Sequence, residues 1–161
     1  MVPFLERDDQ TRLQKIELKL GKNEKLTKRK SLYLCWKLWE WLAQTGVRNK
    51  YKWPEWNLED GNVRMCEFTC PCCEYATDWR GVRDCKKCPL KELWRKIKSG
   101  YLLETRGAWE CDAICGENKE SPYHLWERSK SKETRIIYAT IIAKAAKKEY
   151  FRLTRKLSKN K

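Results

Sequence analysis

The chain has 161 residues, of which 36 are Lys or Arg and 22 are Asp or Glu, so its formal net charge is +14 at pH 7. This length suits one ordinary domain, and no stretch of the sequence has the apolar length that a membrane-spanning helix requires. The first residues also lack the basic and apolar regions of a secretory signal, and we therefore expect a cytoplasmic protein.

The first third of the chain is predicted to hold two helices and a loop. The first helix covers residues 5–20, where apolar side chains recur on one stripe. The second covers about Leu26 to Thr45 and ends before Gly46; its apolar positions, three or four residues apart, are Leu32, Cys35, Trp36, Trp39 and Leu42. In residues 50–57, Pro54 favours an ordered loop over a helix.

The second half of the chain is predicted to end in a long basic helix. Pro89 lies where a short helix can begin, and residues 101–120 look irregular. Ser121-Pro122 then forms a helix start, and the helical pattern runs to about Leu157 with an interruption near residues 129–131. We expect the second helix and the C-terminal helix to pack together through Trp36, Trp39, Ile142, Ala146 and Tyr150.

Four cysteines in the middle of the chain predict a metal site. Cys70 and Cys73 form one CxxC pair, and Cys85 and Cys88 form another after eleven intervening residues. A two-residue spacer lets a tight turn direct two sulfurs at one ion, and two such turns complete a tetrahedron. In a reducing cytosol this pattern favours Zn²⁺ over disulfides, with an iron–sulfur cluster as the chemical alternative. A closed shell of four thiolates predicts a structural zinc.

The other five cysteines leave the ligand set partly open. Cys66 and Cys72 compete for a ligand position in the first pair, whereas Cys35 lies among large apolar residues of the second helix and is predicted to belong to the core. Cys111 and Cys115, with the single histidine, His124, form either part of a second site or two small buried residues and a surface histidine. The sequence favours the latter interpretation.

Together these elements predict a mainly α fold with a small Cys₄ zinc-knuckle or zinc-ribbon-like module inserted between helices. We expect one domain over residues 1–161, because no low-complexity linker interrupts the chain. Its parts are a helical N-terminal part with a Trp-rich loop, the zinc module with its short helix, and the basic C-terminal helix. They cover residues 1–60, 66–98 and 121–157.

A longer pattern joins the cysteines to the start of the last helix: CPxC, CxxCPL, a further cysteine and SPYxxW. The matching residues are Cys70, Cys73, Cys85, Cys88, Pro89, Leu90, Cys115, Ser121, Pro122, Tyr123 and Trp126. This order resembles small zinc-binding proteins of uncharacterised function found among bacteriophage genes, over about residues 30–145 and including the Lys52-Trp53-Pro54 segment. The resemblance implies a phage accessory protein that acts inside a bacterial host, and it identifies no target.

Positive charge is concentrated at the two ends of the chain. Residues 1–30 carry nine bases and five acids and residues 129–161 carry eleven bases and two acids, whereas residues 66–90 carry four of each. Such a basic helix favours a polyanionic partner, and aromatic side chains can stack on bases. We therefore expect nucleic-acid binding through Lys144, Lys147, Lys148, Arg152, Arg155 and Lys156.

The main alternative is a phage-encoded inhibitor or modulator of a host protein, for example a defence complex or a host enzyme. Nine tryptophans are many for a small core, and Trp, Tyr and Arg dominate interface energies. The partner surface would then include Trp53, Trp56 and Trp109. The simplest alternative to both functions is a solvated basic helix with the tryptophans in the core.

We expect no enzymatic activity. One histidine leaves little material for His-based catalysis, and the sequence has no P-loop, no HExxH motif and no zinc-deaminase signature. The oligomeric state is open.

Overall fold

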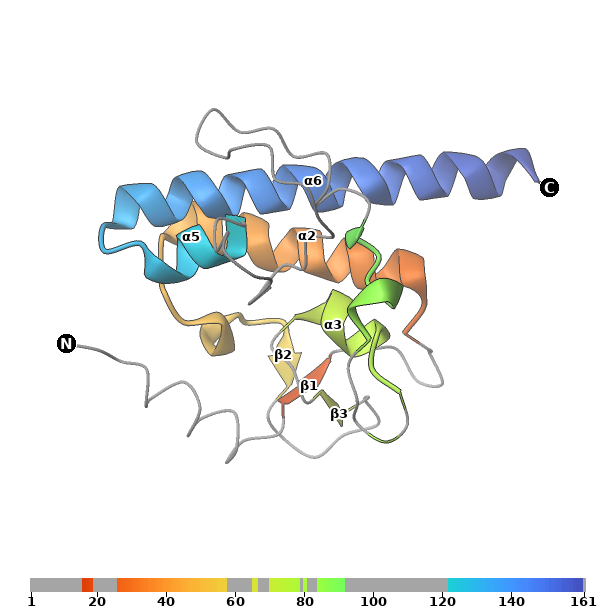
Figure 1. Cartoon of the computed structure of the whole chain (residues 1–161), viewed down its shortest axis with the longest axis horizontal. Coiled ribbons are helices and arrows are strands. Elements are labelled where there is room, and N and C mark those ends of the chain that lie inside the picture. The colour runs from red at the N-terminus through yellow and green to blue at the C-terminus, as the bar shows by residue number, and fades with distance from the viewer. Residues whose placement is uncertain are drawn as a thin grey trace.

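A computed structural model of the protein describes residues 16–18, 26–57, 65–66, 70–78, 80, 84–91 and 122–160. Within these residues the fold is mainly α, as predicted. Its frame is a pair of long helices, α2 (Lys28–Thr45) and α6 (Lys132–Lys159), which lie side by side (Figure 1). No helix in this part of the chain is both long and apolar enough to cross a membrane.

Helix α2 begins and ends where the sequence predicted. Thr27 caps its start, because the Thr27 Oγ1 accepts a hydrogen bond of 3.1 Å from the backbone N–H of Lys30. At the other end Gly46 has a φ of 64°, and its N–H donates to the Leu42 carbonyl at 2.8 Å. This left-handed cap favours glycine, which has no Cβ to clash with the turn.

The basic C-terminal segment is broken into two helices at the predicted place. Helix α5 (Pro122–Arg128) opens with a proline, and α6 starts after Ser131, whose side chain accepts a 3.1 Å hydrogen bond from the Thr134 N–H. Near this corner the Arg135 Nε donates to the Gly46 carbonyl at 3.0 Å. The end of α2 thus meets the start of α6, so the two helices run antiparallel.

The core lies where α2 packs on α5 and α6. Leu38 and Leu42 of α2 are fully buried, as is Ala146 of α6, and Ile142 is 1% exposed. Trp39 is 2% exposed, and its closest aromatic neighbour is Trp126 of α5, with ring centroids 5.1 Å apart. The predicted packing of the second and last helices, which lie side by side in Figure 1, is therefore confirmed. In addition, α5 supplies aromatic partners of Trp39.

A small antiparallel sheet replaces part of the first predicted helix. The central strand β1 (Ile16–Leu18) pairs with β2 (Trp56–Asn57) on one side and with β3 (Met65–Cys66) on the other. The helix predicted over residues 5–20 is therefore wrong at the three residues that the structure describes. The sequence Ile-Glu-Leu fits the two-residue period of a strand equally well, and pairing with two distant segments decides between them.

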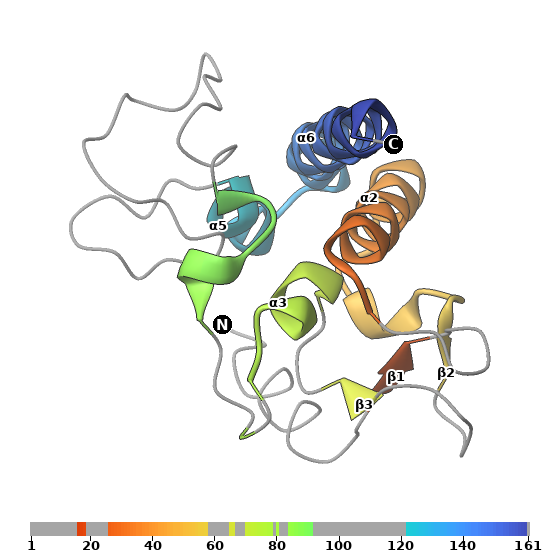
Figure 2. The ribbon, with the colours of Figure 1, turned by 90° about the vertical axis from the view of Figure 1, so that its right-hand side faces the viewer.

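Short elements connect the sheet to the helices. The loop predicted at residues 50–57 contains the 3₁₀ turn η1 (Lys50–Lys52), a turn at Pro54 and strand β2. Helix α3 (Pro71–Tyr75) lies between α2 and the sheet (Figure 2), and a second 3₁₀ turn, η2, covers Cys85–Lys87. Most of the short helix predicted from Pro89, and all of residues 101–120, lie outside the described residues.

Candidate metal centre and nucleic-acid interface

The first predicted cysteine pair opens helix α3. Cys70 occupies the N-cap position, Pro71 is the first helical residue, and Cys73 follows in the first turn. The Cys70 carbonyl accepts a 3.0 Å hydrogen bond from the Glu74 N–H, which closes this turn. Proline thus sets the tight turn that the two-residue spacer was expected to make.

Cys35 of α2 and Cys72 of α3 join this pair. Cys35, Cys70, Cys72 and Cys73 lie close together. Cys35 and Cys73 donate hydrogen bonds to the Cys70 sulfur, and Cys72 donates to both Cys35 and Cys70. The Cys72 Sγ also lies 3.6 Å from the carbonyl oxygen of Ser31 on α2. The cluster therefore connects α3 to the middle of α2, and we call these four residues the thiol cluster.

Two of these sulfurs are fully buried, which bears on two sequence predictions. Cys35 is 0% exposed, so its placement in the core is confirmed, but the sequence did not indicate that its sulfur would meet other thiols. Cys72 is also 0% exposed, whereas Cys70 is half-buried. Cys72 thus lies beside the Cys70–Cys73 pair, and which of these sulfurs would be ligands stays a prediction.

The second predicted pair is described only in part. Cys88 is half-buried against the core and lies close enough to Cys35 for a charge on one sulfur to affect the other. The backbone of Cys85 begins η2, and its side chain lies outside the described residues. Among the side chains that the structure does describe, no three His, Cys, Asp or Glu residues are arranged to hold a metal ion as they stand.

The members of the thiol cluster differ in pKa. Hydrogen bonds from Cys35, Cys72 and Cys73, aided by the charge of Lys50, hold the pKa of the Cys70 thiol well below its ordinary value of 9.0. The hydrogen bond that Cys35 donates to Cys70 raises the pKa of Cys35, and burial raises the pKa of Cys72. One thiolate surrounded by thiols is chemically suited to a soft, thiophilic metal ion.

Lys50 is a buried cation beside these sulfurs, and sequence analysis missed it. Its residue is 8% exposed, and its Nζ donates to the Tyr123 hydroxyl at 3.1 Å. The Nζ also lies 4.6 Å from the Tyr123 ring centre, 5.9 Å from that of Trp39 and 6.0 Å from that of Trp126. Burial alone would lower the pKa of Lys50, but the negative charge available at Tyr123 and Cys70 raises it.

Residues from two widely separated motifs meet around Lys50. Tyr123 and Trp126 come from SPYxxW, and their rings surround the ammonium group of Lys50. Cys70 and Cys73, from CPxC, supply the opposite charge. A buried ammonium is costly without an anion, and thiolates held by a metal would be such an anion.

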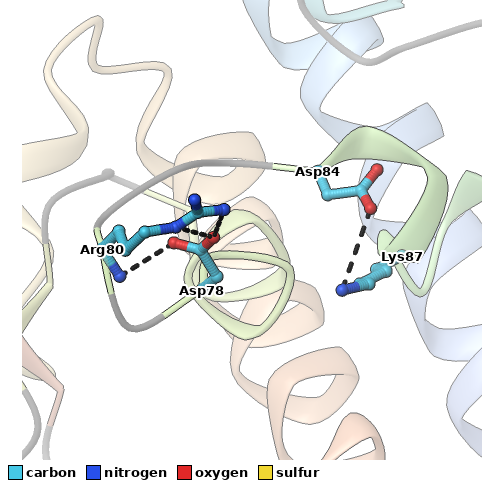
Figure 3. Close-up of polar contacts among 4 residues, drawn as sticks. All are labelled: Asp78, Arg80, Asp84 and Lys87. Carbon is cyan, nitrogen blue, oxygen red and sulfur yellow. Dashed lines mark hydrogen bonds and ion pairs between the residues drawn. The ribbon is translucent and has the colours of Figure 1, made fainter.

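Two bases of the cysteine module, Arg80 and Lys87, form ion pairs with nearby carboxylates. Figure 3 shows Arg80 folded onto Asp78, with its terminal nitrogen 2.8 Å from the carboxylate, and Lys87 facing Asp84 at 3.9 Å. Both basic side chains are mostly exposed. Among the described bases, the buried Lys50 is therefore the best suited to balance negative charge on the sulfurs.

The predicted nucleic-acid-binding residues lie on exposed positions of α6. Lys144, Lys147, Lys148, Arg155 and Lys156 are all exposed along this helix. Arg152 is also exposed, but its guanidinium holds the carboxylate of Glu149, a residue only 5% exposed, in a two-armed ion pair. Glu149 thus offsets Arg152, and we count the other five bases as the ones available to phosphate.

An aromatic cluster crosses from α2 to this basic face. The Trp36 ring centre lies 6.0 Å from that of Tyr150 and 5.8 Å from that of Phe151, and Tyr33 lies 5.7 Å from both Trp36 and Tyr150. Phe151 is 43% exposed, whereas the other three rings are half-buried. We call Tyr33, Trp36, Tyr150 and Phe151 the aromatic cluster.

Three lysines surround the aromatic cluster. The Nζ of Lys37 lies 4.2 Å and that of Lys147 lies 5.1 Å from the centre of the Trp36 ring. The Nζ of Lys30 lies 5.6 Å from the centre of the Tyr33 ring. Bases from both helices therefore lie beside aromatic surface, which a helix-by-helix interpretation of the sequence did not predict. One acid lies among them: the Glu40 carboxylate is 3.2 Å from the Lys37 Nζ and accepts from the Trp36 Nε1 at 3.3 Å.

The alternative partner surface receives no support from the described tryptophans. Trp53 is 4% exposed and Trp56 is 7% exposed, and their rings pack edge to face with centroids 5.1 Å apart. The Trp56 Nε1 donates to the Lys50 carbonyl at 2.8 Å. These two rings therefore brace the loop that carries Lys50, and they are not available to a partner. Trp109 lies outside the described residues.

The residues of the second cysteine–histidine group are likewise not placed. Cys111 and Cys115 lie outside the described residues, as do the side chains of Cys66 and His124. The interpretation of these four residues stays a prediction.

Comparisons with known proteins were negative: no protein-family model matches the sequence, and neither a curated protein nor a solved structure shows significant similarity to the chain.

Proposed function

We propose that this protein binds nucleic acid through the basic face of α6 and that a structural zinc site stabilises its fold. The observation that carries the proposal is the row of exposed bases on α6, of which Lys147 lies beside the aromatic cluster together with the half-buried Lys37 of α2. The only acid in the second half of α6 is Glu149, and it is buried against Arg152. Such a face attracts phosphate, and it carries little negative charge that would repel a polyanion.

The proposed zinc ligands are Cys70, Cys73, Cys85 and Cys88. Cys70 and Cys73 are positioned by the α3 turn, Cys88 lies near Cys35, and the second pair has the same two-residue spacing. Cys35 and Cys72 stay beside this shell as thiols that hydrogen-bond to Cys70. Zinc in a closed thiolate shell has no open coordination position, so it contributes folding energy and no catalysis.

Elemental analysis tests the zinc proposal. We expect one zinc per chain, and Cys85→Ser should release it, because binding energy at a structural site is folding energy. Cys35→Ser is the matched comparison, since this residue is proposed to lie beside the shell. Retention of zinc by Cys85→Ser and its loss from Cys35→Ser would place Cys35 in the ligand set and Cys85 outside it.

Salt dependence of binding tests the nucleic-acid proposal. If three to five bases neutralise duplex phosphates, the logarithm of the affinity should fall with the logarithm of the salt concentration at a slope of about −3 to −5. The double variant Lys147→Ala, Lys148→Ala should reduce the steepness of that slope by about two, because each lost phosphate contact removes about one.

The control is a double variant of bases that lie away from this face. Arg80→Ala, Lys87→Ala removes the same charge from the cysteine module, where both side chains face carboxylates. It should leave the slope unchanged. Equal slopes for the native protein and the α6 variant, or failure to retain polynucleotide at moderate salt, would contradict the proposal.

The resemblance to phage proteins suggests the setting, an accessory protein inside a bacterial host, and the rival partner, a host protein. A pull-down from host lysate with and without nuclease separates these partners. Nucleic acid that disappears on nuclease treatment supports the proposal. A stoichiometric protein that survives the treatment would instead favour an inhibitor or modulator that binds through the basic surface.

A further inference from the structure

Phe151 is an exposed aromatic residue in an otherwise cationic part of α6. Residues three and four apart are neighbours on a helix surface, and the neighbours of Phe151 at these spacings are Lys147, Lys148, Thr154 and Arg155. The three basic neighbours are exposed. One side of the Phe151 ring packs on Trp36 and Tyr150, and its exposed part can contact a ligand that also carries negative charge.

The second helix extends the aromatic surface. Trp36 of α2 lies 5.8 Å from Phe151, and the ring planes are inclined by 53°. The ammonium groups of Lys37 and Lys147 lie near the Trp36 ring. An exposed cation–π contact stabilises by only about 0.5–1 kcal/mol. Lys147 can therefore leave the ring for a phosphate at little cost, whereas Lys37 also forms an ion pair of 3.2 Å with Glu40, whose carboxylate accepts from the Trp36 Nε1.

We propose that the aromatic cluster is a stacking platform for single-stranded nucleic acid, with Phe151 and Trp36 contacting bases and Lys147 and Lys148 contacting the adjacent phosphates. This inference rests on the proposed nucleic-acid binding and adds the form of the ligand. In a duplex the base faces are stacked on one another and cannot reach a side-chain ring. In a single strand they alternate with phosphates, which matches rings surrounded by bases.

An anionic membrane surface would also attract lysines, but the distribution of apolar side chains disfavours it. The apolar stripe of α6, represented by Ile142 and Ala146, is buried against α2. The exposed large apolar residues of this helix are Ile137, Phe151 and Leu157. A helix that lies in a membrane interface needs a continuous apolar face, which these separated residues do not form.

Affinity for matched oligonucleotides tests the proposal on the full chain. A labelled oligothymidylate and a mixed-sequence duplex of the same length are titrated with the native protein and with Phe151→Leu, Phe151→Tyr and Leu157→Ala. Phe151→Leu keeps apolar volume and removes the ring. It should weaken single-strand binding about 5- to 100-fold, the range for loss of one stacked base, and leave duplex binding unchanged.

The two other variants are controls. Phe151→Tyr keeps a ring and should bind the single strand like the native protein. Leu157 is 46% exposed, close to the 43% of Phe151, so Leu157→Ala removes a comparable apolar side chain from the same helix and should not change affinity. Because both positions are exposed, the three variants should retain the fold, which far-UV circular dichroism checks.

The outcomes separate this inference from the function on which it rests. Equal binding of single strand and duplex, with Phe151→Leu like the native protein, overturns the platform and leaves phosphate binding by α6 intact. Failure to bind either polynucleotide overturns both proposals. Binding to phosphatidylserine vesicles that is lost in Phe151→Leu, without a preference for single strands, overturns the platform in favour of a membrane contact.

Discussion

At the scale of the residue, Lys50 and Cys70 form the least expected pair. The sequence predicted a metal site from the spacing of its cysteines, because ligand geometry is local to each CxxC turn. It did not predict that Cys35 or Lys50 would lie beside that turn. Both are brought there by packing of α2, η1 and α5 on one another, and neither stands at a spacing that marks a ligand. The sequence around Cys35 indicated only an apolar environment, and the sequence around Lys50 indicated only a loop.

The low pKa of Cys70 predicts selective alkylation in the metal-free protein. Cys70 is half-buried and its pKa is lowered, whereas Cys35 and Cys72 are fully buried and their pKa values are raised. Limited treatment with iodoacetamide near neutral pH should therefore modify Cys70 before the other members of the thiol cluster. Peptide mass spectrometry identifies the modified residue, and bound zinc should protect it.

Removing the charge of Lys50 should slow this reaction. The positive charge of Lys50 lowers the pKa of Cys70, so Lys50→Met should raise that pKa and move the pH profile of alkylation upward. Lys52→Met, at an exposed position of the same turn, is the matched control and should leave the profile unchanged. First modification at Cys73 would show that Cys70 is not the most reactive thiol of the cluster. Identical profiles for both variants would show that the charge of Lys50 does not act on Cys70.

The same shift contributes to the stability of the metal-free fold. A thiol with a depressed pKa stabilises the folded state fully above its ordinary pKa of 9.0, and this contribution is lost as the pH falls towards the folded-state pKa. The raised pKa values of Cys35 and Cys72 act in the opposite sense and favour the fold at lower pH. Together these shifts favour a fold in which Cys70 loses its proton before Cys35 and Cys72 do.

Trp39 should be a major contributor to stability. It is 2% exposed and contacts Tyr123 and Trp126 of α5, so Trp39→Ala should lower the free energy of unfolding by about 3–5 kcal/mol. Urea denaturation measures this loss. Ile137→Ala, at a position that is 48% exposed, should change stability by less than about 0.5 kcal/mol. Similar losses in both variants would contradict the assigned core.

At the scale of the element, the long helices α2 and α6 were predictable, whereas the sheet and the short helix α3 were not. The limits of α2 and the break before α6 depend on Thr27, Gly46 and Ser131, whose capping chemistry acts over three or four residues and can be recognised in the sequence. Strand β1 has three residues and exists through pairing with β2 and β3, which lie about 40 and 50 positions further along the chain. No local pattern specifies such pairing.

Removal of the α6 cap provides a test of this local control. Ser131→Ala deletes the oxygen that accepts from the Thr134 N–H and should destabilise the protein by about 1 kcal/mol. Ser158→Ala removes a hydroxyl near the other end, where the Ser158 Oγ donates to the Thr154 carbonyl within the helix and caps nothing. Thermal unfolding should show a lower midpoint for the first variant alone. Equal midpoints would mean that tertiary packing, and not the cap, sets the start of α6.

At the scale of the whole molecule, α2 connects the metal centre to the nucleic-acid interface. Its buried side carries Cys35, which meets the thiol cluster at α3, and its partly exposed side carries Tyr33 and Trp36, which meet α6. Figure 2 shows α3 and α6 on different sides of this helix. The zinc module can therefore affect nucleic-acid binding through α2 without touching the nucleic acid.

Metal removal should consequently separate affinity from its salt dependence. The buried contacts between α2, α5 and α6 include Trp39, Trp126 and Ile142 and do not depend on the thiol cluster, so chelation should leave most of the helical circular dichroism intact. Loss of the link between α3 and α2 should loosen α2 and weaken binding. The slope against salt should stay the same, because the phosphate contacts are made by the α6 bases and each contact fixes its share of that slope.

Salt titrations of the native, chelated and zinc-restored protein decide between this indirect effect of the metal and direct contact by the cysteine module. Lower affinity at an unchanged slope, recovered when zinc is restored, is the expected result. A slope that becomes shallower by one or more on chelation would instead mean that bases of the cysteine module, such as Lys86, contact phosphate themselves. Lys86→Ala in the zinc-loaded protein should then reproduce the shallower slope. If the charge that governs binding lies on α6, as we propose, Lys86→Ala leaves both the affinity and the slope unchanged.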